Sequence, residues 1–173
     1  METFESFEQI QLNRSWLAIG VFDGIHLGHQ QILRGLVTEA RKATEPSVVI
    51  TFHPHPLIVL HNYRDPLYLT SPQQRKEILE NLGIDIVITQ PFTKTFADQS
   101  AQDFLSRLNK HLNFCELWAG YDFALGKDRQ ADIGALDKMS KSLGYTLRKF
   151  DPITLDGEVI SSSAIRAKLQ LGE

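Results

Sequence analysis

Two histidines stand three residues apart where a buried strand gives way to a helix. The segment W-L-A-I-G-V-F-D-G-I-H-L-G-H-Q-Q-I covers residues 16–32 and contains His26 and His29. The apolar run up to Ile19 is typical of a strand buried on both faces, and from Leu27 the apolar residues recur at helical intervals. The first turn of a helix presents unpaired backbone N–H groups and the positive end of its dipole, so the segment predicts an anion-binding site.

Other residues of this turn fit a site for a charged ligand. The spacing of the histidines places both imidazoles on one side of the opening helical turn. Gly24 and Gly28 would leave room for a ligand to approach the backbone closely. Asp23 either orients the turn or lies near a metal ion, and it equally fits an ordinary turn and helix-capping residue. By itself, so short a motif also fits histidines that only cap or pack a helix.

A second cluster of this kind lies near the other end of the chain. The sequence I-S-S-S-A-I-R covers residues 160–166 and places three hydroxyls at an expected helix start. As pure structure the serines fit a helix cap, but Ser163 and Arg166 share one face, so hydroxyl, backbone N–H and guanidinium can converge on one anion. An arginine in a first turn is unfavourable for the helix dipole, which also predicts an anion beside it.

These residues need elements that bring them together, and the apolar patterns predict buried strands alternating with helices. Strands are expected at residues 16–19, 47–52, 85–89, 114–119 and 145–150, and helices from residues 27, 71, 100, 132 and 161. This alternation is typical of an α/β fold with a Rossmann-like, doubly wound parallel sheet, here expected as a single domain over residues 1–173. Such sheets bind ligands beyond the carboxyl ends of their strands, where the strand order reverses. The turn at residues 26–29, residues 53–56 and the loops after Phe92 and Gly120 are therefore expected to meet at one edge.

Three stretches outside these elements carry less signal. Residues 1–15 receive no role. The prolines of T-F-H-P-H-P, residues 51–56, hold the chain extended and predict a rigid rim at the end of a strand. Residues 57–70 are expected to be irregular, with a loop tip at residues 61–66.

The composition favours a soluble globular protein of the cytoplasm. The 173 residues are 42 % hydrophobic with a formal net charge of −3, so the chain has no excess of basic residues to hold a nucleic acid. The N-terminal region has no apolar stretch long enough for a signal peptide or a membrane span, and no membrane partner is expected. Cys115 is the only cysteine, which excludes an internal disulfide.

Two other kinds of site fit less well. A zinc ion could use His26, His29, His53 and His55, but no cysteine or glutamate completes a recognised ligand spacing. A dinucleotide-dependent dehydrogenase is disfavoured because the turn after the first predicted strand lacks G-x-G-x-x-G.

Taken together, the motifs resemble the FMN adenylyltransferase (FAD synthetase) module of bacterial bifunctional riboflavin kinase/FAD synthetase, a member of the nucleotidyltransferase superfamily. The likeness rests on G-V-F-D-G-I-H-L-G-H (20–29), T-F-H-P-H-P (51–56), P-F-T-K-T-F (91–96), G-Y-D-F-A-L-G-K (120–127) and S-S-S-A-I-R (161–166). Ser163 stands where the family has threonine, which keeps the hydroxyl. The motifs occur in the family's order and cover nearly the whole chain.

This resemblance implies transfer of the adenylyl group from ATP to FMN, giving FAD and pyrophosphate by in-line attack without a covalent enzyme intermediate. Mg²⁺ is expected to enter with ATP, without direct protein ligands. The implied catalytic residues are His26, His29, Ser162, Ser163 and Arg166. The implied ATP contacts are Gly20, Phe22, Asp23, Gly24, Gly28, Gly120 and Asp122. The implied FMN contacts are Phe52, Pro54, His55 and Phe92.

The chain departs from the family pattern near its fourth motif. The family usually has an acidic residue at Tyr121, often arginine at Ala124, phenylalanine at Leu125 and glycine near Ala131. These changes bear on substrate affinity more than on the type of reaction. The sequence also lacks the β-barrel riboflavin kinase of bifunctional members, so no kinase activity is expected. A riboflavin kinase domain or protein would then be the partner that supplies FMN.

Two further functions remain open. One is a nucleotidyltransferase for another phosphorylated acceptor, such as phosphopantetheine or nicotinamide mononucleotide, although the T-F-H-P-H-P rim favours flavin. The other is a non-catalytic nucleotide- or flavin-binding module, which the altered segment at residues 120–131 leaves open.

Overall fold

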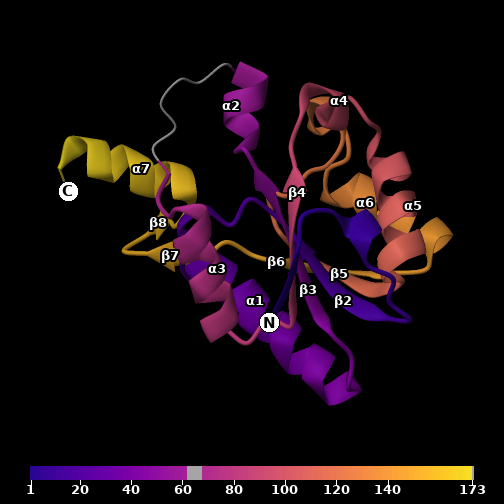
Figure 1. Cartoon of the computed structure of the whole chain (residues 1–173). Coiled ribbons are helices and arrows are strands. Elements are labelled where there is room, and N and C mark those ends of the chain that lie inside the picture. The colour runs from indigo at the N-terminus through magenta and orange to yellow at the C-terminus, as the bar shows by residue number, and fades with distance from the viewer. Residues whose placement is uncertain (62–67, 173) are drawn as a thin grey trace.

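In the computed structural model, which describes residues 1–61 and 68–172, a parallel sheet of six strands runs through the middle of the molecule (Figure 1). The strands are β1 (Glu2–Phe4), β2 (Ser15–Ile19), β3 (Ser47–His53), β4 (Ile86–Pro91), β5 (Phe114–Gly120) and β6 (Thr146–Phe150). Their order is β1-β4-β3-β2-β5-β6, and each neighbouring pair is parallel. The predicted Rossmann-like α/β fold is confirmed.

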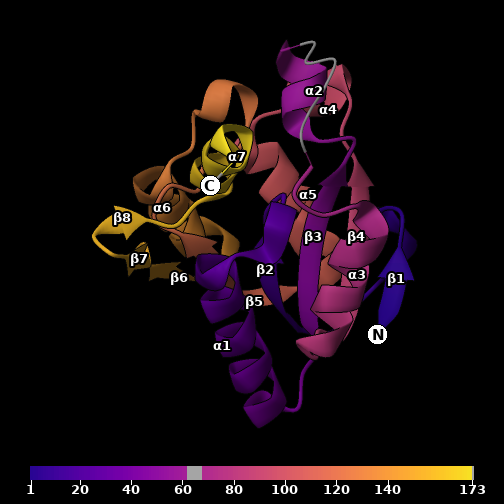
Figure 2. The ribbon, with the colours of Figure 1, turned by 90° about the vertical axis from the view of Figure 1, so that its left-hand side faces the viewer.

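Helices cover both faces of the sheet (Figure 2). One face carries α1 (Leu27–Ala43) and α3 (Pro72–Asn81), and the other carries α5 (Ala101–Leu112) and α6 (Ile133–Leu143). The C-terminal helix is α7 (Ser162–Leu171). The short elements are α2 (Pro56–His61), α4 (Lys94–Ala97), the hairpin of β7 (Thr154–Leu155) and β8 (Glu158–Val159), and 3₁₀ turns at Phe7–Gln9, Asp23–Ile25 and Lys127–Arg129.

Strand β2 lies at the centre of the core. Leu17 and Ile19 belong to the apolar cluster on the α5 face, whereas Trp16 and Ala18 belong to the cluster on the α1 face. Because side chains alternate along a strand, burial on both faces requires an uninterrupted apolar run, which is what the sequence has.

The helix starts follow the capping residues in the sequence. Ser71 forms a capping box with Gln74 at the start of α3. Ser100, Asp132 and Ser161 each accept a hydrogen bond from the backbone N–H three residues on, at the starts of α5, α6 and α7. The predicted starts of these helices are confirmed.

The N-terminal segment and the stretch after β3 differ from the sequence-based expectation. Residues 1–15, which received no role, contribute the edge strand β1 and a fully buried Phe7. Helix α2 occupies part of the stretch expected to be extended or irregular. Pro56 starts it, because the missing N–H and fixed φ of proline are tolerated at a first helical position. Of the expected loop tip at residues 61–66, only His61 lies within the described residues.

The strand order reverses at β2, with β3 on one side and β5 on the other. The carboxyl end of β2 therefore lies at the topological switch point of the sheet, where ligands bind folds of this class. Helices α2 and α4 stand at the same end of the sheet in both views (Figures 1 and 2). The fold thus places the turn with the two histidines at the predicted edge.

Gly35 tests how α1 packs on the sheet. A Cβ atom at this position would lie 2.5 Å from Cζ3 of Trp118, whose indole is buried. For Gly35→Ala, helix propensity contributes about 1 kcal/mol, but overpacking costs about 1–3 kcal/mol, so we expect the free energy of unfolding to fall. Chemical denaturation measures this change.

The control is Gly134→Ala in the first turn of α6, because the added Cβ would meet only Oδ1 of Asp132 at 3.4 Å. This control should keep or slightly raise the stability. A Gly35→Ala variant as stable as the control would contradict the close packing of α1 on Trp118.

Candidate active site

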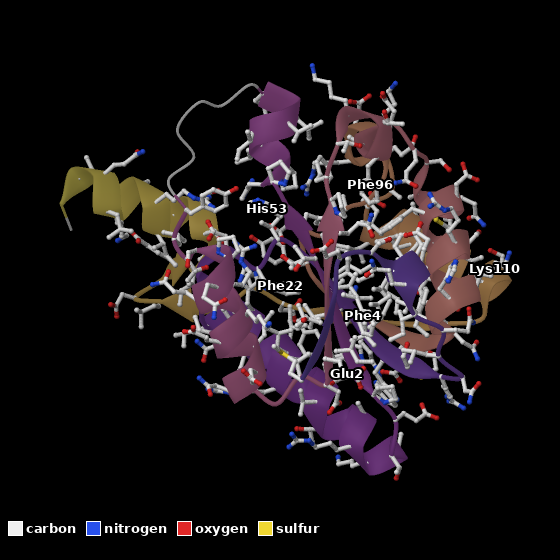
Figure 3. The ribbon with its side chains drawn as sticks, viewed as in Figure 1. Glu2, Phe4, Phe22, His53, Phe96 and Lys110 are labelled. Carbon is white, nitrogen blue, oxygen red and sulfur yellow. The ribbon has the colours of Figure 1, made fainter. Side chains whose placement is uncertain are left out.

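A cleft of about 950 Å³ opens at the carboxyl edge of the sheet. Its walls come from the ends of β2, β3, β4, β5 and β6 and from the start of α7. Phe22 and Phe96 line it. Figure 3 shows Phe96 and His53 toward this end of the sheet, whereas Glu2 lies toward the other. The predicted meeting of the loops after these strands at one edge is confirmed.

His26 and His29 form a stacked pair in the cleft wall. Their ring centroids are 3.7 Å apart with an interplanar angle of 25°, and the edge of the Phe22 ring lies near His29 with a centroid distance of 5.2 Å. Both Nδ1 atoms are buried and have no hydrogen-bond partner among the described residues. The prediction that both imidazoles lie on one side of the turn is confirmed.

Burial holds both imidazoles in their neutral form. It lowers the pKa of His29 to about 3, and the neighbouring His26 ring acts in the same direction. Burial also lowers the pKa of His26, partly offset by Asp122. At neutral pH the pair therefore offers N–H donors rather than fixed positive charges.

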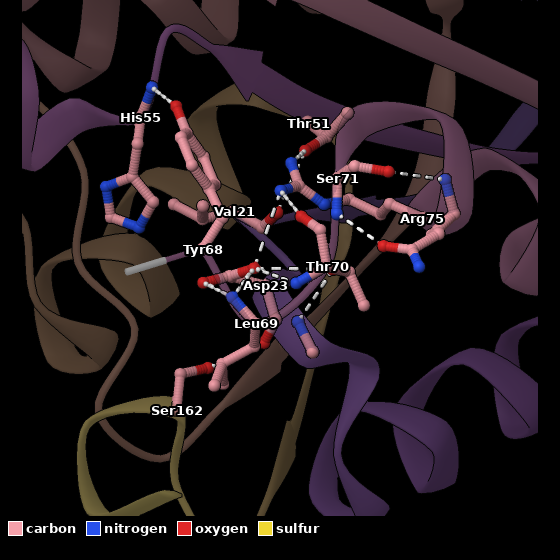
Figure 4. Close-up of polar contacts among 12 residues, drawn as sticks. Val21, Asp23, Thr51, His55, Tyr68, Leu69, Thr70, Ser71, Arg75 and Ser162 are labelled. Atoms are coloured by element: carbon pink, nitrogen blue, oxygen red, sulfur yellow. Dashed lines mark hydrogen bonds and ion pairs between the residues drawn. The ribbon is translucent and has the colours of Figure 1, made fainter. Parts of the chain in front are cut away.

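The Asp23 carboxylate is almost completely buried, with 1 % of the residue exposed. It accepts hydrogen bonds from the Leu69 amide at 3.1 Å, the Thr70 amide at 3.1 Å and the Thr70 hydroxyl at 3.3 Å (Figure 4). Burial alone raises the pKa of this carboxyl, but the Arg166 hydrogen bond and the two amides outweigh it, so the pKa lies below its ordinary value. Since His26 is the N-cap of α1, Asp23 orients the turn rather than capping the helix.

Residues in the first turns of α7 contact the same aspartate. Nη2 of Arg166 lies 2.5 Å from Oδ2 of Asp23, and the Ser162 hydroxyl donates to the Asp23 carbonyl oxygen at 2.8 Å. The two clusters that were each predicted to bind an anion meet here, through residues 143 positions apart in sequence. An anion beside Arg166 was expected to come from a ligand, and the chain supplies one itself with Asp23. Ser163 is exposed and lines the cleft.

The glycines of the turn make room for the protein's own side chains. A Cβ at Gly24, whose φ is +77°, would lie 2.8 Å from Cδ1 of Leu69, and a Cβ at Gly28 would lie 3.2 Å from Cε1 of His26. Gly28 lines the cleft and Gly24 does not, so the close approach of a ligand to the backbone at these glycines stays a prediction.

The part of the cleft expected to hold adenosine lies beside β2 and β5. Gly20, Phe22, Gly120 and Asp122 all line it. Phe22 has a left-handed backbone conformation with φ of 51°, and a Cβ at Gly20 would lie 3.1 Å from its ring.

The part expected to hold flavin is lined by aromatic rings. Phe52 and Phe92 meet edge to face with centroids 5.5 Å apart, and Phe96 packs against both. His55 is 7 % exposed, its Nδ1 accepts from the Leu57 amide at 3.1 Å, and burial lowers its pKa. Pro54 is not among the residues that line the cleft, unlike the other three predicted flavin contacts.

Sequence reasoning missed the residues that hold Asp23 from the other side. Leu69 and Thr70 lie in a stretch without regular structure and gave no signal. Arg75 is 3 % exposed on α3 and lies 3.6 Å from Asp23. It precedes the buried Leu79 by four residues, so a charged residue on an apolar helix face was the available signal.

Two of the departures from the family pattern belong to the core, and one of them, Leu125, also lines the cleft. Leu125 and Ala131 pair with each other through two backbone hydrogen bonds and are 8 % and 1 % exposed. Tyr121 is exposed at the rim of the cleft, and Ala124 lines it.

The four-histidine zinc site considered from the sequence is not assembled. Among the residues that the structure describes, no three His, Cys, Asp or Glu side chains gather in a way that could hold a metal ion. His53, one of its members, is exposed outside the cleft lining, whereas the pair at the start of α1 stacks ring on ring.

Comparisons with known proteins place this geometry in context. The sequence model described as FAD synthetase matches residues 8–164. The chain is 36 % identical over 154 residues to the bifunctional riboflavin kinase/FMN adenylyltransferase of Escherichia coli strain K12, covering 88 % of this chain and 49 % of that protein. It is 33 % identical over 162 residues to the protein of the same name from Bacillus subtilis strain 168, covering 92 % and 51 %. It therefore spans about half the length of the curated relatives it matches.

A solved structure also shares the fold. It is described as a macrolide-efflux protein from Streptococcus pneumoniae, with a TM-score of 0.80 and 28 % identity, and the match covers 95 % of this chain and 54 % of that one. In residues 1–61 and 68–172, none of the helices combines the length and the apolar character needed to cross a membrane.

The neutral state of His29 predicts a pH dependence of stability. The unfolded chain takes up this proton near pH 6.5, whereas the folded chain takes it up only at about pH 3. The stability due to neutral His29 is therefore complete above pH 6.5 and is lost as the pH falls toward 3, with a slope of at most about 1.4 kcal/mol per pH unit. Urea denaturation between pH 7.5 and pH 4.5 should show a shallower slope for His29→Asn than for the unchanged protein.

His61→Asn is the matched control, because His61 is exposed at the end of α2. Its stability should follow the pH as that of the unchanged protein does. Equal slopes for His29→Asn and the unchanged protein would show that His29 titrates normally in the fold.

Proposed function

The chain belongs to the FAD synthetase family, and from this premise we propose that it transfers the adenylyl group of ATP to FMN, giving FAD and pyrophosphate. The observation that carries the proposal is the junction of two helix starts at Asp23. There the imidazoles of α1 and the serine-arginine cluster of α7 border one cleft. Two helix N-termini, N–H donors and a guanidinium fit a triphosphate.

The reaction balances without a protein nucleophile. A phosphate oxygen of FMN attacks the α-phosphorus of ATP and forms the new P–O bond, while the bond from that phosphorus to the α,β-bridging oxygen breaks. Pyrophosphate leaves with the electron pair, and FMN phosphate at neutral pH needs no base to remove a proton. Positioning and charge stabilisation would supply the catalysis.

Each phosphate-binding group has a distinct task in this proposal. His26 and His29 donate hydrogen bonds to the α-phosphate and the leaving group, and the incoming negative charge raises their pKa values again. The backbone N–H groups of Ser162 and Ser163, with the Ser163 hydroxyl, receive the pyrophosphate side. Arg166, held by Asp23, adds charge beside it.

Mg²⁺ would enter as part of the ATP substrate. Coordinated by the phosphate oxygens, it would neutralise part of the triphosphate charge. The Asp23 carboxylate, engaged by amides and guanidinium groups, is assigned to positioning rather than to the metal.

The acceptor side fits a flavin through its aromatic wall. Phe52 and Phe92 would contact the isoalloxazine ring, and His55 would lie nearby. A broad apolar surface with a few polar groups suits a large planar ligand. The curated relatives are bifunctional with riboflavin kinase, so we infer that a kinase domain or protein supplies the FMN.

The assay is the incubation of the protein with ATP, Mg²⁺ and FMN, followed by chromatography of the flavins. We expect FAD and pyrophosphate in equal amounts, and no adenylylated product from phosphopantetheine or nicotinamide mononucleotide. Product from another acceptor alone would change the substrate assignment. Binding of ATP and FMN without pyrophosphate release would leave only a binding module.

The His29→Ala variant tests the site. We expect its kcat to fall by about a hundredfold or more, because a donor to the developing charge is lost, while its melting temperature changes little. His111→Ala is the control, since its ring packs on Phe7 on the α5 side of the sheet. Full turnover by the His29→Ala variant would contradict the assignment of the imidazoles.

A further inference from the structure

We propose that Arg75 is a positioning residue for the phosphate site: from inside the fold its guanidinium fixes the Asp23 turn and so sets the affinity for ATP. The inference rests on the proposed function, because it concerns the ATP site of that reaction. Arg75 is absent from the residues that line the cleft, so it would act through Asp23 rather than by touching ATP.

The guanidinium joins three segments of the chain. Its Nη1 donates to the Thr51 hydroxyl oxygen at 3.2 Å, at the end of β3. Its Nη2 donates to the Thr70 carbonyl oxygen at 3.4 Å and lies 3.6 Å from Oδ1 of Asp23 (Figure 4). The Thr51 hydroxyl in turn donates to the Val21 carbonyl oxygen at 2.9 Å, directly before the turn. Arg75 therefore fastens both sides of the segment that carries Asp23.

Packing alone does not account for an arginine at this position. The residue is 3 % exposed, and its Nε atom has no hydrogen-bond partner in the described part of the chain. A buried guanidinium loses its hydration, and an unsatisfied donor adds to that cost, so an apolar side chain of similar volume would often serve stability as well. The guanidinium provides what such a side chain lacks, a fixed charge and directed donors at the Asp23 turn.

The Asp23 turn contacts the starts of both α1 and α7, so its position affects both. The Thr70 hydroxyl accepts from the Gly24 amide at 3.0 Å, close to the stacked histidines of α1. On the other side, Ser162 and Arg166 hold Asp23 from the first turn of α7. A shift of the turn would therefore move phosphate-binding groups of both helices, and a misplacement of about 1 Å reduces function by up to a hundredfold.

The experiment compares Arg75→Gln and Arg75→Lys with Lys76→Gln, an exposed neighbour on the same helix. For Arg75→Gln we expect the Kd for ATP, measured by calorimetry without FMN, to rise about tenfold or more. The KM for FMN should stay within about twofold of its original value. Arg75→Lys, which keeps the charge but loses the paired donors, should give a smaller rise, and Lys76→Gln should give none.

A purely structural role predicts a different pattern. Loss of melting temperature without a change in the Kd of the folded protein for ATP, or an equal loss of ATP and FMN affinity, would overturn the inference. If Arg75→Gln does not fold, Thr51→Val removes one partner of the guanidinium. It should raise the Kd for ATP about threefold or more, and an unchanged Kd would again overturn the inference.

The failure of this inference differs from the failure of the proposed function. A protein that makes FAD while Arg75→Gln binds ATP normally contradicts the inference alone. A protein that makes no FAD but binds ATP more tightly than Arg75→Gln does contradicts the reaction alone and supports the role of Arg75. A protein that binds no ATP contradicts both.

Discussion

The buried carboxylate of Asp23 is the constraint on which the rest of the site depends. An ionised group that loses its hydration is destabilising by several kcal/mol unless hydrogen bonds and opposite charges replace the water. Here the partners are the Leu69 and Thr70 amides and two guanidinium groups, and they come from α3, the segment before it and α7. None of these partners can move away without leaving an unpaired charge in the interior. The carboxylate therefore holds the turn after β2 against the start of α7, and the two segments together line one side of the cleft.

The stacking of His26 on His29 depends on both imidazoles being neutral. A stacked pair with a ring separation of 3.7 Å is unfavourable when both rings are charged, and burial keeps them neutral. The neutral imidazoles therefore do not repel each other, while they and the N-termini of α1 and α7 border the cleft. When a polyphosphate enters, its own charge makes protonation of the imidazoles more favourable. The site would thus gain positive charge as the ligand arrives.

The sequence predicted the layers of the fold because β-branched and apolar runs, capping serines and glycine stops all indicated the same alternation. The meeting of residues 20–29 with residues 161–166 was expected for another reason, because both motifs offer an anion-binding site at a helix start. The sequence could not predict which residues donate hydrogen bonds to Asp23, because Leu69 and Thr70 use their backbone amides, which any residue type except proline has. Phe7 was missed for a related reason: one aromatic residue in a polar segment carries no periodicity, and its burial follows from the placement of the edge strand.

The most direct test of the central claim is a titration of the isotope-labelled protein with a non-hydrolysable ATP analogue and Mg²⁺, followed by NMR of the backbone amides. The amides of Gly28 and His29 open α1, and those of Ser162 and Ser163 open α7. If one triphosphate spans the Asp23 junction, all four resonances shift together and give a single Kd. Shifts confined to one helix start, or different Kd values for the two, would contradict a shared phosphate site.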